Sequence, residues 1–299
     1  MLKAPTNDDF ELCYEVTGSG EPLIFVHEFA GQKESWELQV RHFSRQYQCI
    51  TYNARGYPPS SVPPSVSSYS QNIAVADILA VMNHLKITKA NIVGLSMGGF
   101  ATLHFGLQHP DRASSLVVAG CGYGAELEQR AQFREEAQAS ANMLLQHGMK
   151  ALANKYAYGP TRVSFERSDP RGFKEFIEQF SNHSALGSAN TQLGIQRERP
   201  SLYDLEKELR KLNVPTLILN GDEDWPCLRP GLMLKETIPC AALAILPNCG
   251  HTMNLEMPNE FNHVVEKFLH HANSGRWPLR DPRAMVASIT GMNNYTFNL

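Results

Sequence analysis

The residues best suited to chemistry surround a serine at position 96. Ser96 stands between Gly94 and Gly98, after the apolar run 90–95 and before a helix-like stretch. Small neighbours permit a tight turn from strand to helix, which exposes the hydroxyl and leaves the N–H of Met97 free to stabilise an oxyanion. A glycine-rich loop without chemistry would show the same five residues, but the strand and helix on either side favour a nucleophile.

A serine hydroxyl is a weak nucleophile unless a histidine takes its proton and a carboxylate orients that histidine. Three acids, Asp222, Glu223 and Asp224, follow the apolar run 215–219, and His251 follows the run 241–246. If these runs are strands of one sheet, their loops reach the same edge as Ser96. We therefore expect Ser96 and His251 to act together with one of the acids.

In its order of serine, acid and histidine, the chain resembles the α/β-hydrolase superfamily from about residue 10 to residue 271. Two further motifs carry this resemblance: the Gly-x-x-Asp loop that ends at Asp224, and Gly250-His251 followed by Glu256 and Pro258. The resemblance implies that Asp224 is the catalytic acid. Asp222 and Glu223 would then be solvated loop charges or helpers that cap the turn.

The segment His27-Glu28-Phe29 departs from the family pattern, which has a glycine after the histidine. In the family, the residue after that glycine donates the second oxyanion N–H, so the resemblance implies Phe29 and Met97 as the two backbone donors. Glu28 stands where the glycine is usual. It is a candidate for contact with the substrate, a water or His251, but we favour a tolerated replacement whose side chain points away.

A second departure is the segment 53–60, which is similar to the family's Asp-x-Arg-Gly-x-Gly-x-Ser loop. Asn53 replaces the aspartate and Pro58 replaces the second glycine. The resemblance implies that Arg55 is structural and ties loops together.

The elements that must position these residues alternate between strand-like and helix-like runs, except in the segment 125–212, which has helix-like stretches and no convincing strand. This predicts an α/β-hydrolase fold, a mostly parallel sheet flanked by helices with an inserted helical cap. The expected core is 1–124 and 213–272, the cap 125–212 and the C-terminal tail 273–299, which would pack on the surface or mediate contacts. The runs 10–16 and 22–27 are expected to form a hairpin. Apolar cap residues could form a roof over a substrate or simply pack together.

Composition limits the partners of the protein. Of 299 residues, 42% are hydrophobic and 19% charged, and the net charge of -3 gives no electrostatic footprint for nucleic acid or a membrane. The N-terminus lacks a signal-peptide run, and no stretch reaches the roughly 18 to 20 apolar residues of a membrane span. Six cysteines without a Cys-x-x-Cys pair are typical of a reducing compartment. We expect a cytoplasmic protein with a small-molecule substrate, no metal or other cofactor, and a homodimer as one alternative for its assembly.

A serine at position 96 argues against the epoxide hydrolases and haloalkane dehalogenases, which resemble this chain but use an aspartate there. The favoured function is a serine hydrolase that cleaves a small carboxylic ester or lactone through an acyl-enzyme. One alternative is a C–C bond hydrolase acting on an aromatic ring-cleavage product, with the same three residues. Another is a ligand-binding protein without catalysis on the same fold, which the complete set of catalytic residues disfavours.

Overall fold

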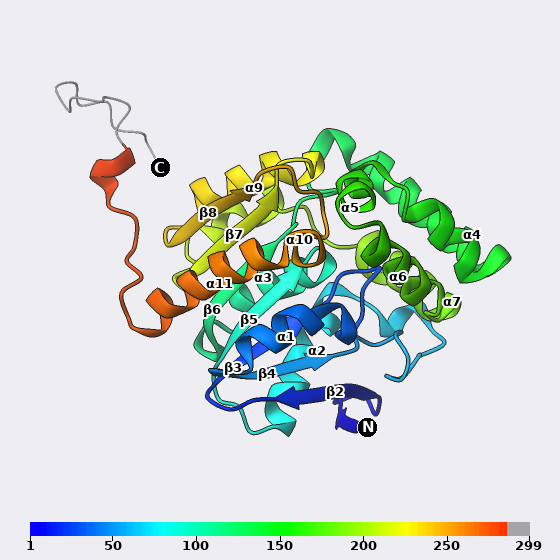
Figure 1. Ribbon diagram of the computed structural model, residues 1–299, viewed down its shortest axis with the longest axis horizontal. Helices are drawn as coiled ribbons and strands as arrows, with labels where there is room; N and C mark the ends of the chain where they lie inside the picture. The colour runs from blue at the N-terminus through cyan, green and yellow to red at the C-terminus, as the bar shows by residue number, and fades with distance from the viewer. Residues whose placement is uncertain (286–299) are drawn as a thin grey trace.

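The computed structural model describes residues 1–285, except for the side chains of residues 282 and 285, and an eight-stranded sheet runs through its centre (Figure 1). The strand order is β1-β2-β4-β3-β5-β6-β7-β8, and all pairs from β4 to β8 are parallel. The strands are β1 (Leu2–Pro5), β2 (Glu11–Thr17), β3 (Glu21–Val26), β4 (Tyr47–Tyr52), β5 (Ala90–Leu95), β6 (Ala113–Ala119), β7 (Thr216–Gly221) and β8 (Ala241–Leu246). This is the mostly parallel sheet that the sequence predicts.

The predicted hairpin between β2 and β3 is wrong, because β4 lies between these two strands. β2 pairs antiparallel with β4 and with β1, whereas β3 pairs parallel with β4 and β5. The turn after β2 passes against the backbone that leads into β4: a Cβ at Gly18 would lie 2.2 Å from the carbonyl oxygen of Ser44. With φ of +82°, Gly18 permits this close crossing in place of a tight hairpin turn.

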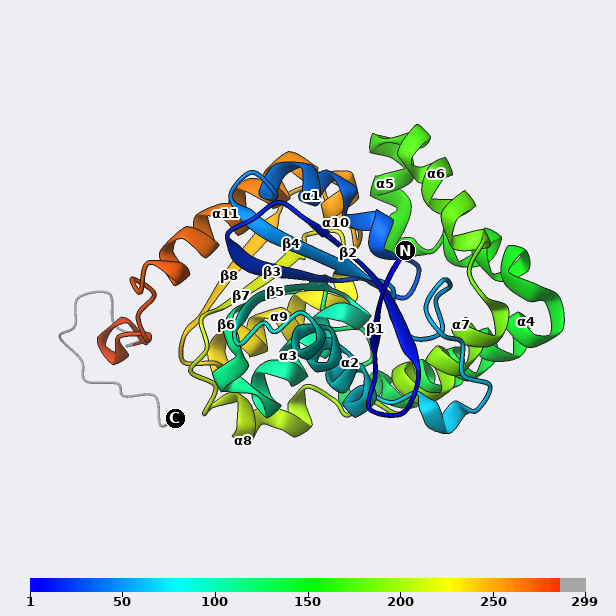
Figure 2. The same cartoon turned by 90° about the horizontal axis from the view of Figure 1, so that it is seen from below.

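Helices cover both faces of the sheet (Figure 2). One face carries α2 (Gln71–His84), α3 (Met97–Gln108), α8 (Glu206–Leu209) and α9 (Trp225–Thr237). The other carries α1 (Glu37–Phe43), α10 (Met253–Glu256) and α11 (Pro258–Asn273). Strand β5 shows why both faces are apolar: Ile92 packs into the first core and Val93 into the second.

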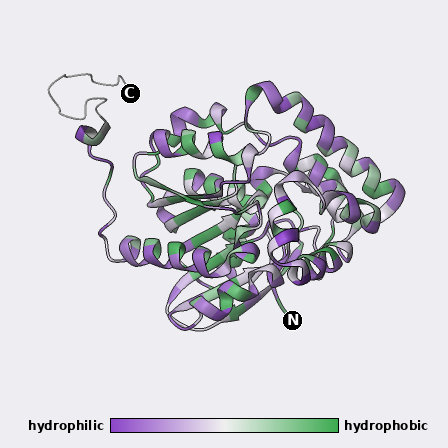
Figure 3. Cartoon of the chain, turned by 45° about the horizontal axis from the view of Figure 1, so that its top comes forward, coloured by the Kyte–Doolittle hydropathy of each residue, from purple (hydrophilic) through white to green (hydrophobic). Residues whose placement is uncertain are grey.

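The segment between β6 and β7 contains helices and no strand, as predicted, and its helices other than α8 stand beyond one end of the sheet (Figure 1). Besides α8, its elements are η4 (Leu127–Gln129), α4 (Arg130–Tyr156), η5 (Pro160–Arg162), α5 (Val163–Ser168), α6 (Pro170–Ser181), α7 (Ala185–Thr191), η6 (Gln192–Gln196) and η7 (Tyr203–Leu205). Polar residues line the outer surfaces of these helices (Figure 3). We call the helices α4 to α7 and the turns between them the cap.

Most of the apolar cap residues pack against one another. Phe173, Phe176 and Phe180 recur at helical spacing on α6 and are buried in a core that the cap shares with the loops beneath it. Leu145 and Tyr158, by contrast, are exposed. The aromatic pattern of α6 therefore serves chiefly to hold the cap together.

The chain after α11 begins by packing on the sheet edge. The indole N–H of Trp277 donates to the carbonyl of Cys240 at 2.6 Å, and its ring contacts Phe268 edge-on. Residues 286–299 of the predicted tail lie outside the described residues. Within residues 1–285, no helix combines the length and the apolar character needed to cross a bilayer.

Candidate active site

Ser96 occupies a strained turn between β5 and α3. Its φ is +54° and its ψ is -115°, a conformation that side chains other than glycine rarely adopt. The flanking glycines are required by space: a Cβ at Gly98 would lie 2.1 Å from the carbonyl oxygen of Val26, and one at Gly94 would lie 2.1 Å from that of Gly98. The turn places Ser96, which is half-buried, at the N-terminus of α3.

His251 and Asp224 are hydrogen-bonded to each other in the loops after β8 and β7. Nδ1 of His251 lies 2.7 Å from Oδ2 of Asp224, and both side chains are buried. Burial by itself would raise the pKa of the Asp224 carboxyl, but the contact with His251 outweighs burial and lowers that pKa. Asp224 is therefore ionised, and Nδ1 of His251 carries the proton of the hydrogen bond. Within residues 1–285, Nε2 of His251 makes no hydrogen bond and is available to accept a proton.

A short backbone segment connects Ser96 with His251. The N–H of Ser96 donates to the carbonyl of Ala119 at 2.8 Å, and the next residue, Gly120, lies against the imidazole. A Cβ at Gly120 would lie 3.3 Å from Cε1 of His251, and the φ of Gly120 is +53°. In the described residues Ser96 Oγ and His251 are not hydrogen-bonded to each other; such bonds are often long in enzymes without substrate.

The two acids beside Asp224 have other positions. Asp222 accepts a hydrogen bond from the N–H of Cys249 at 3.1 Å, which braces the loop that carries His251. Glu223 is exposed. Of the three predicted candidates, Asp224 is the one that contacts the histidine.

The loop after β3 holds one peptide group in a fixed orientation. The carbonyl of Glu28 accepts from Nδ1 of His27 at 2.7 Å and from the N–H of Gly31 at 3.1 Å. Nε2 of His27 accepts from the N–H of Ala54, and burial lowers the pKa of His27 to about 4, so this ring is neutral with its proton on Nδ1. Because C=O and N–H point in opposite directions across a trans peptide, the N–H of Phe29 faces away from these partners.

Neither proposed oxyanion donor has an acceptor within the described part of the chain. The N–H of Phe29 donates no hydrogen bond there, and Met97 is the first residue of α3, where an N–H lacks an intrahelical partner. Both residues are buried. Two unpaired, buried N–H groups near a strained serine are suited to binding a developing negative charge.

Glu28 is buried and paired, so the interpretation that its side chain points away is wrong. Its carboxylate accepts two hydrogen bonds from the guanidinium of Arg162, at 2.6 and 3.2 Å, and the side chains of the two residues are 3% and 2% exposed. Arg162 lies in η5 of the cap and also contacts the faces of Tyr156 and Phe176. Nothing in the sequence near Glu28 points to this partner, which is 134 residues away.

The cap is also joined to the loop of His251. The N–H of His251 donates to the carbonyl of Thr161 at 2.9 Å. Glu256 accepts from the hydroxyl of Ser164 at 2.5 Å and from the N–H groups of Gly250 and Thr252. The glutamate of the Gly-His motif thus holds the histidine loop and the cap together.

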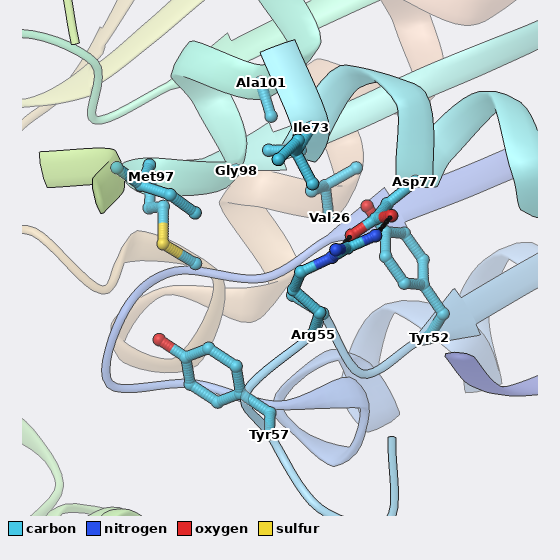
Figure 4. A pocket seen from close by; sticks show the side chains of 12 residues that line it. Val26, Tyr52, Arg55, Tyr57, Ile73, Asp77, Met97, Gly98 and Ala101 are labelled. Atoms are coloured by element: carbon cyan, nitrogen blue, oxygen red, sulfur yellow. Dashed lines mark hydrogen bonds and ion pairs between the residues drawn. The ribbon is translucent and has the colours of Figure 1, made fainter. Parts of the chain in front are cut away.

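Arg55 lies outside this site, in an ion pair with Asp77 at 2.7 Å and with Asp8 at 2.6 Å. Figure 4 shows the Arg55–Asp77 pair on one side of a small pocket and Met97 on the other. The pocket holds about 20 Å³, room for a single water and far less than the roughly 300 Å³ or more of a ligand site. Arg55 therefore organises the loops behind Met97, as the resemblance implies for this residue.

One group of residues has the composition of a metal site. The ligand atoms of Asp224, Cys227 and His251 lie within 4.8 Å of one another. Burial raises the pKa of the Cys227 thiol well above its usual value, so the sulfur stays protonated and is a poor metal ligand. Asp224 and His251 already bind each other, which suits acid–base chemistry better than metal binding.

Comparison with known proteins agrees with this geometry. A family model described as alpha/beta hydrolase fold matches residues 21–258. The chain is 28% identical to 3-oxoadipate enol-lactonase 2 of Acinetobacter baylyi, over 90% of this chain and 96% of that protein. It is 30% identical to 2-hydroxymuconate semialdehyde hydrolase of Pseudomonas putida, over 86% of this chain and 90% of that protein.

A solved structure of a thermophilic esterase from Thermogutta terrifontis superposes with a TM-score of 0.81 at 25% identity, covering 91% of this chain and 98% of that one. The family match spans most of the chain and includes the elbow at Ser96, the acid loop and His251. The chain therefore belongs to the alpha/beta hydrolase fold family.

Proposed function

We propose that this hydrolase cleaves a small carboxylic ester or lactone through an acyl-enzyme on Ser96. The observation that carries the proposal is the buried His251–Asp224 hydrogen bond of 2.7 Å. The ring of His251 packs on Gly120, and the preceding residue, Ala119, accepts from the N–H of the strained Ser96. The named activities of the relatives, an enol-lactonase and an esterase among them, support the same class of reaction.

In the proposed reaction, Nε2 of His251 takes the proton of Ser96 as Oγ attacks the carbonyl carbon. Asp224 stabilises the imidazolium that forms, because its carboxylate already accepts from Nδ1. The protonated His251 then gives its proton to the leaving oxygen as the C–O bond breaks. A water activated by the same histidine hydrolyses the acyl-enzyme and returns Ser96 to its starting state.

The N–H groups of Met97 and Phe29 would hold the negative oxygen of the tetrahedral intermediate. Both carboxylate oxygens of Glu28 accept from Arg162 and the side chain is 3% exposed, so little of the carboxylate is open to a substrate. The proposed role of Glu28 is therefore to fix the loop that carries Phe29 against the cap.

A C–C bond hydrolase is the second candidate, supported by the semialdehyde hydrolase among the relatives. The same three residues would serve, with a carbon leaving group in place of an oxygen. A ligand-binding protein without catalysis is the third candidate; the strain at Ser96 and the buried hydrogen bond between His251 and Asp224 argue against it.

A substrate panel separates these candidates. Purified protein and the Ser96→Ala variant would be assayed against p-nitrophenyl esters of increasing chain length, lactones and dienoic ring-cleavage products. The proposal expects turnover of esters or lactones by the wild type and none by the variant. Turnover confined to ring-cleavage products would favour the C–C hydrolase, and saturable binding without any turnover would favour the binding protein.

The placement of the protein in the cell and its organisation are also proposals. The six cysteines are free and buried in the described residues, which supports the cytoplasmic location that the sequence predicts. The division into a core and a cap at residues 125–212 is supported by the helices α4 to α7 in that segment, although α8 at its end packs on the sheet. A homodimer and the small-molecule substrate stay predictions.

A further inference from the structure

Arg199 differs from the other buried cations in having no carboxylate partner within residues 1–285. Two of the buried acids form ion pairs, Glu28 with Arg162 and Asp77 with Arg55, and the third, Asp224, is hydrogen-bonded to His251. The buried cations of the described residues are Lys33, Arg55, Arg162 and Arg199, and the first three have carboxylate partners. Arg199 is 4% exposed and forms no ion pair within residues 1–285.

The hydrogen bonds of Arg199 go only to neutral groups and leave part of the guanidinium unused. Nη2 donates to the carbonyl of Tyr123 at 2.5 Å, and Nη1 donates to the side-chain oxygen of Gln196. Nε is buried and has no hydrogen-bond partner in the described residues. The rings of Phe100 and Phe133 lie 3.7 and 4.9 Å from the guanidinium carbon, and they cannot neutralise its charge.

The guanidinium lies beside the proposed catalytic residues. Phe100, which it contacts, is one helical turn after Ser96 on α3. Tyr123, whose carbonyl accepts from Arg199, is three residues after Gly120, the glycine packed against His251. These contacts place Arg199 at the boundary between the cap and the site.

Tyr156 connects Arg199 to the other side of the site. The charges of Arg162, Glu28 and Arg199 all act on the Tyr156 phenol. Tyr156 and Ser96 are half-buried, whereas Met97, Phe29 and Arg199 are buried. Ser96 and Tyr156 therefore keep some surface that a substrate can contact.

Burial lowers the pKa of Arg199 to about 10, so the side chain is still a cation near neutral pH. A buried cation without a counter-charge is costly, and a carboxylate is the group that a guanidinium binds best, through two parallel hydrogen bonds. The unpaired Nε and the lack of a direct carboxylate partner within residues 1–285 both favour an anion at this place.

We propose that Arg199 binds a carboxylate on the substrate, so that the preferred ester or lactone is an anion with its carboxylate remote from the scissile bond. This inference rests on the proposed esterase or lactonase function of Ser96. It makes Arg199 a specificity residue that discriminates between charged and neutral substrates of the same length.

The test compares monomethyl adipate with dimethyl adipate, two methyl esters of one chain length that differ in a terminal negative charge, by the release of methanol. The wild type is expected to prefer the monoanion in kcat/KM, chiefly through KM. Arg199→Gln should reduce this preference roughly tenfold to a hundredfold, the effect of losing a charged hydrogen bond. Arg199→Lys, which keeps the charge, should retain part of it. Arg197→Gln is the matched control, because Arg197 is on the same segment but 39% exposed.

A second measurement separates failure of this inference from failure of the proposed function. The Ser96→Ala protein is expected to gain thermal stability from adipate but not from neutral 1,6-hexanediol, and to lose that gain when Arg199→Gln is added. If the esters are not cleaved but adipate still stabilises the protein through Arg199, the function fails and the anion site stands. If esters are cleaved without a preference for the monoanion, or if adipate does not stabilise the Ser96→Ala protein, the anion site is overturned. If Arg199→Gln lowers the turnover of both esters equally, Arg199 is structural. Arg199 is also structural if Arg199→Gln does not fold and adipate leaves the thermal stability of the Ser96→Ala protein unchanged.

Discussion

Glu28 and Arg162 form a buried, two-point ion pair between the loop after β3 and the cap. The shorter contact is 2.6 Å, and the guanidinium also lies 3.4 Å from the hydroxyl of Thr252, next to His251. The pair therefore joins three parts of the molecule: the loop of Phe29, the cap and the histidine loop. Glu28, which replaces the usual glycine, therefore links the proposed oxyanion site to the cap.

Breaking the Glu28–Arg162 ion pair should lower the free energy of unfolding. Glu28→Gln leaves Arg162 as a buried, uncompensated cation, which is expected to lower the free energy of unfolding by about 3–5 kcal/mol. Urea unfolding followed by circular dichroism measures the change. The control is Glu175→Gln, which breaks an exposed pair with Arg171 and should cost less than about 1 kcal/mol. A loss below 1 kcal/mol for Glu28→Gln would mean that the pair does not tie the cap to the loop.

Asp224 and Asp222 should differ sharply in their effect on turnover. Asp224→Asn removes the charge that orients and stabilises His251, and kcat should fall on the order of 10⁴-fold. Asp222→Asn retains an oxygen that can accept from Cys249, so kcat should fall less than about tenfold. Steady-state kinetics on the best ester of the panel provide the comparison. Equal losses in the two variants would speak against Asp224 as the acid partner of His251.

The dependence of turnover on pH should report His251. Burial by itself would lower the pKa of His251, but the charge of Asp224 and its hydrogen bond outweigh burial and raise that pKa above its usual value of about 6.5. Because the neutral imidazole is the base, kcat/KM should fall as the pH drops through this raised pKa and level off above it.

Glu28 contributes to that raised pKa, whereas Arg162 opposes it. In Glu28→Gln the negative charge is lost and the positive charge remains, so the acidic limb of the profile should move to lower pH. Glu175→Gln, far more exposed, should leave the profile unchanged. A shift of the Glu28→Gln limb to higher pH would contradict the electrostatic role assigned to this pair.

The positions of Ser96, Asp224 and His251 in the fold could be predicted from the sequence, because neighbours in the chain determine them. The glycines around Ser96 and the apolar runs before Asp224 and His251 determine where strands end, and a parallel sheet then brings their ends to one edge. The strand β5 and the strand β8 have the bounds that the apolar runs predict.

Contacts between segments far apart in the chain could not be predicted from the sequence in the same way. The partner of Glu28 is in the cap, and the pairing of β2 depends on β4 inserting beside it, which a Gly18-Ser19-Gly20 turn does not reveal. The unpaired state of Arg199 likewise emerges only when every other buried charge has been assigned a partner. These features depend on contacts between segments far apart in the chain, and one sequence carries no local signal for those contacts.

If Ser96 is an activated nucleophile, a fluorophosphonate should label it covalently. The folded wild type would be treated with a fluorophosphonate, and the adduct would be located by mass spectrometry of peptides, with Ser96→Ala and His251→Ala treated in parallel. One adduct per chain is expected, on Ser96, absent in Ser96→Ala and formed far more slowly in His251→Ala. A protein that hydrolyses esters while Ser96 stays unmodified, or a label on another residue that abolishes turnover, would contradict the role of Ser96 as the nucleophile.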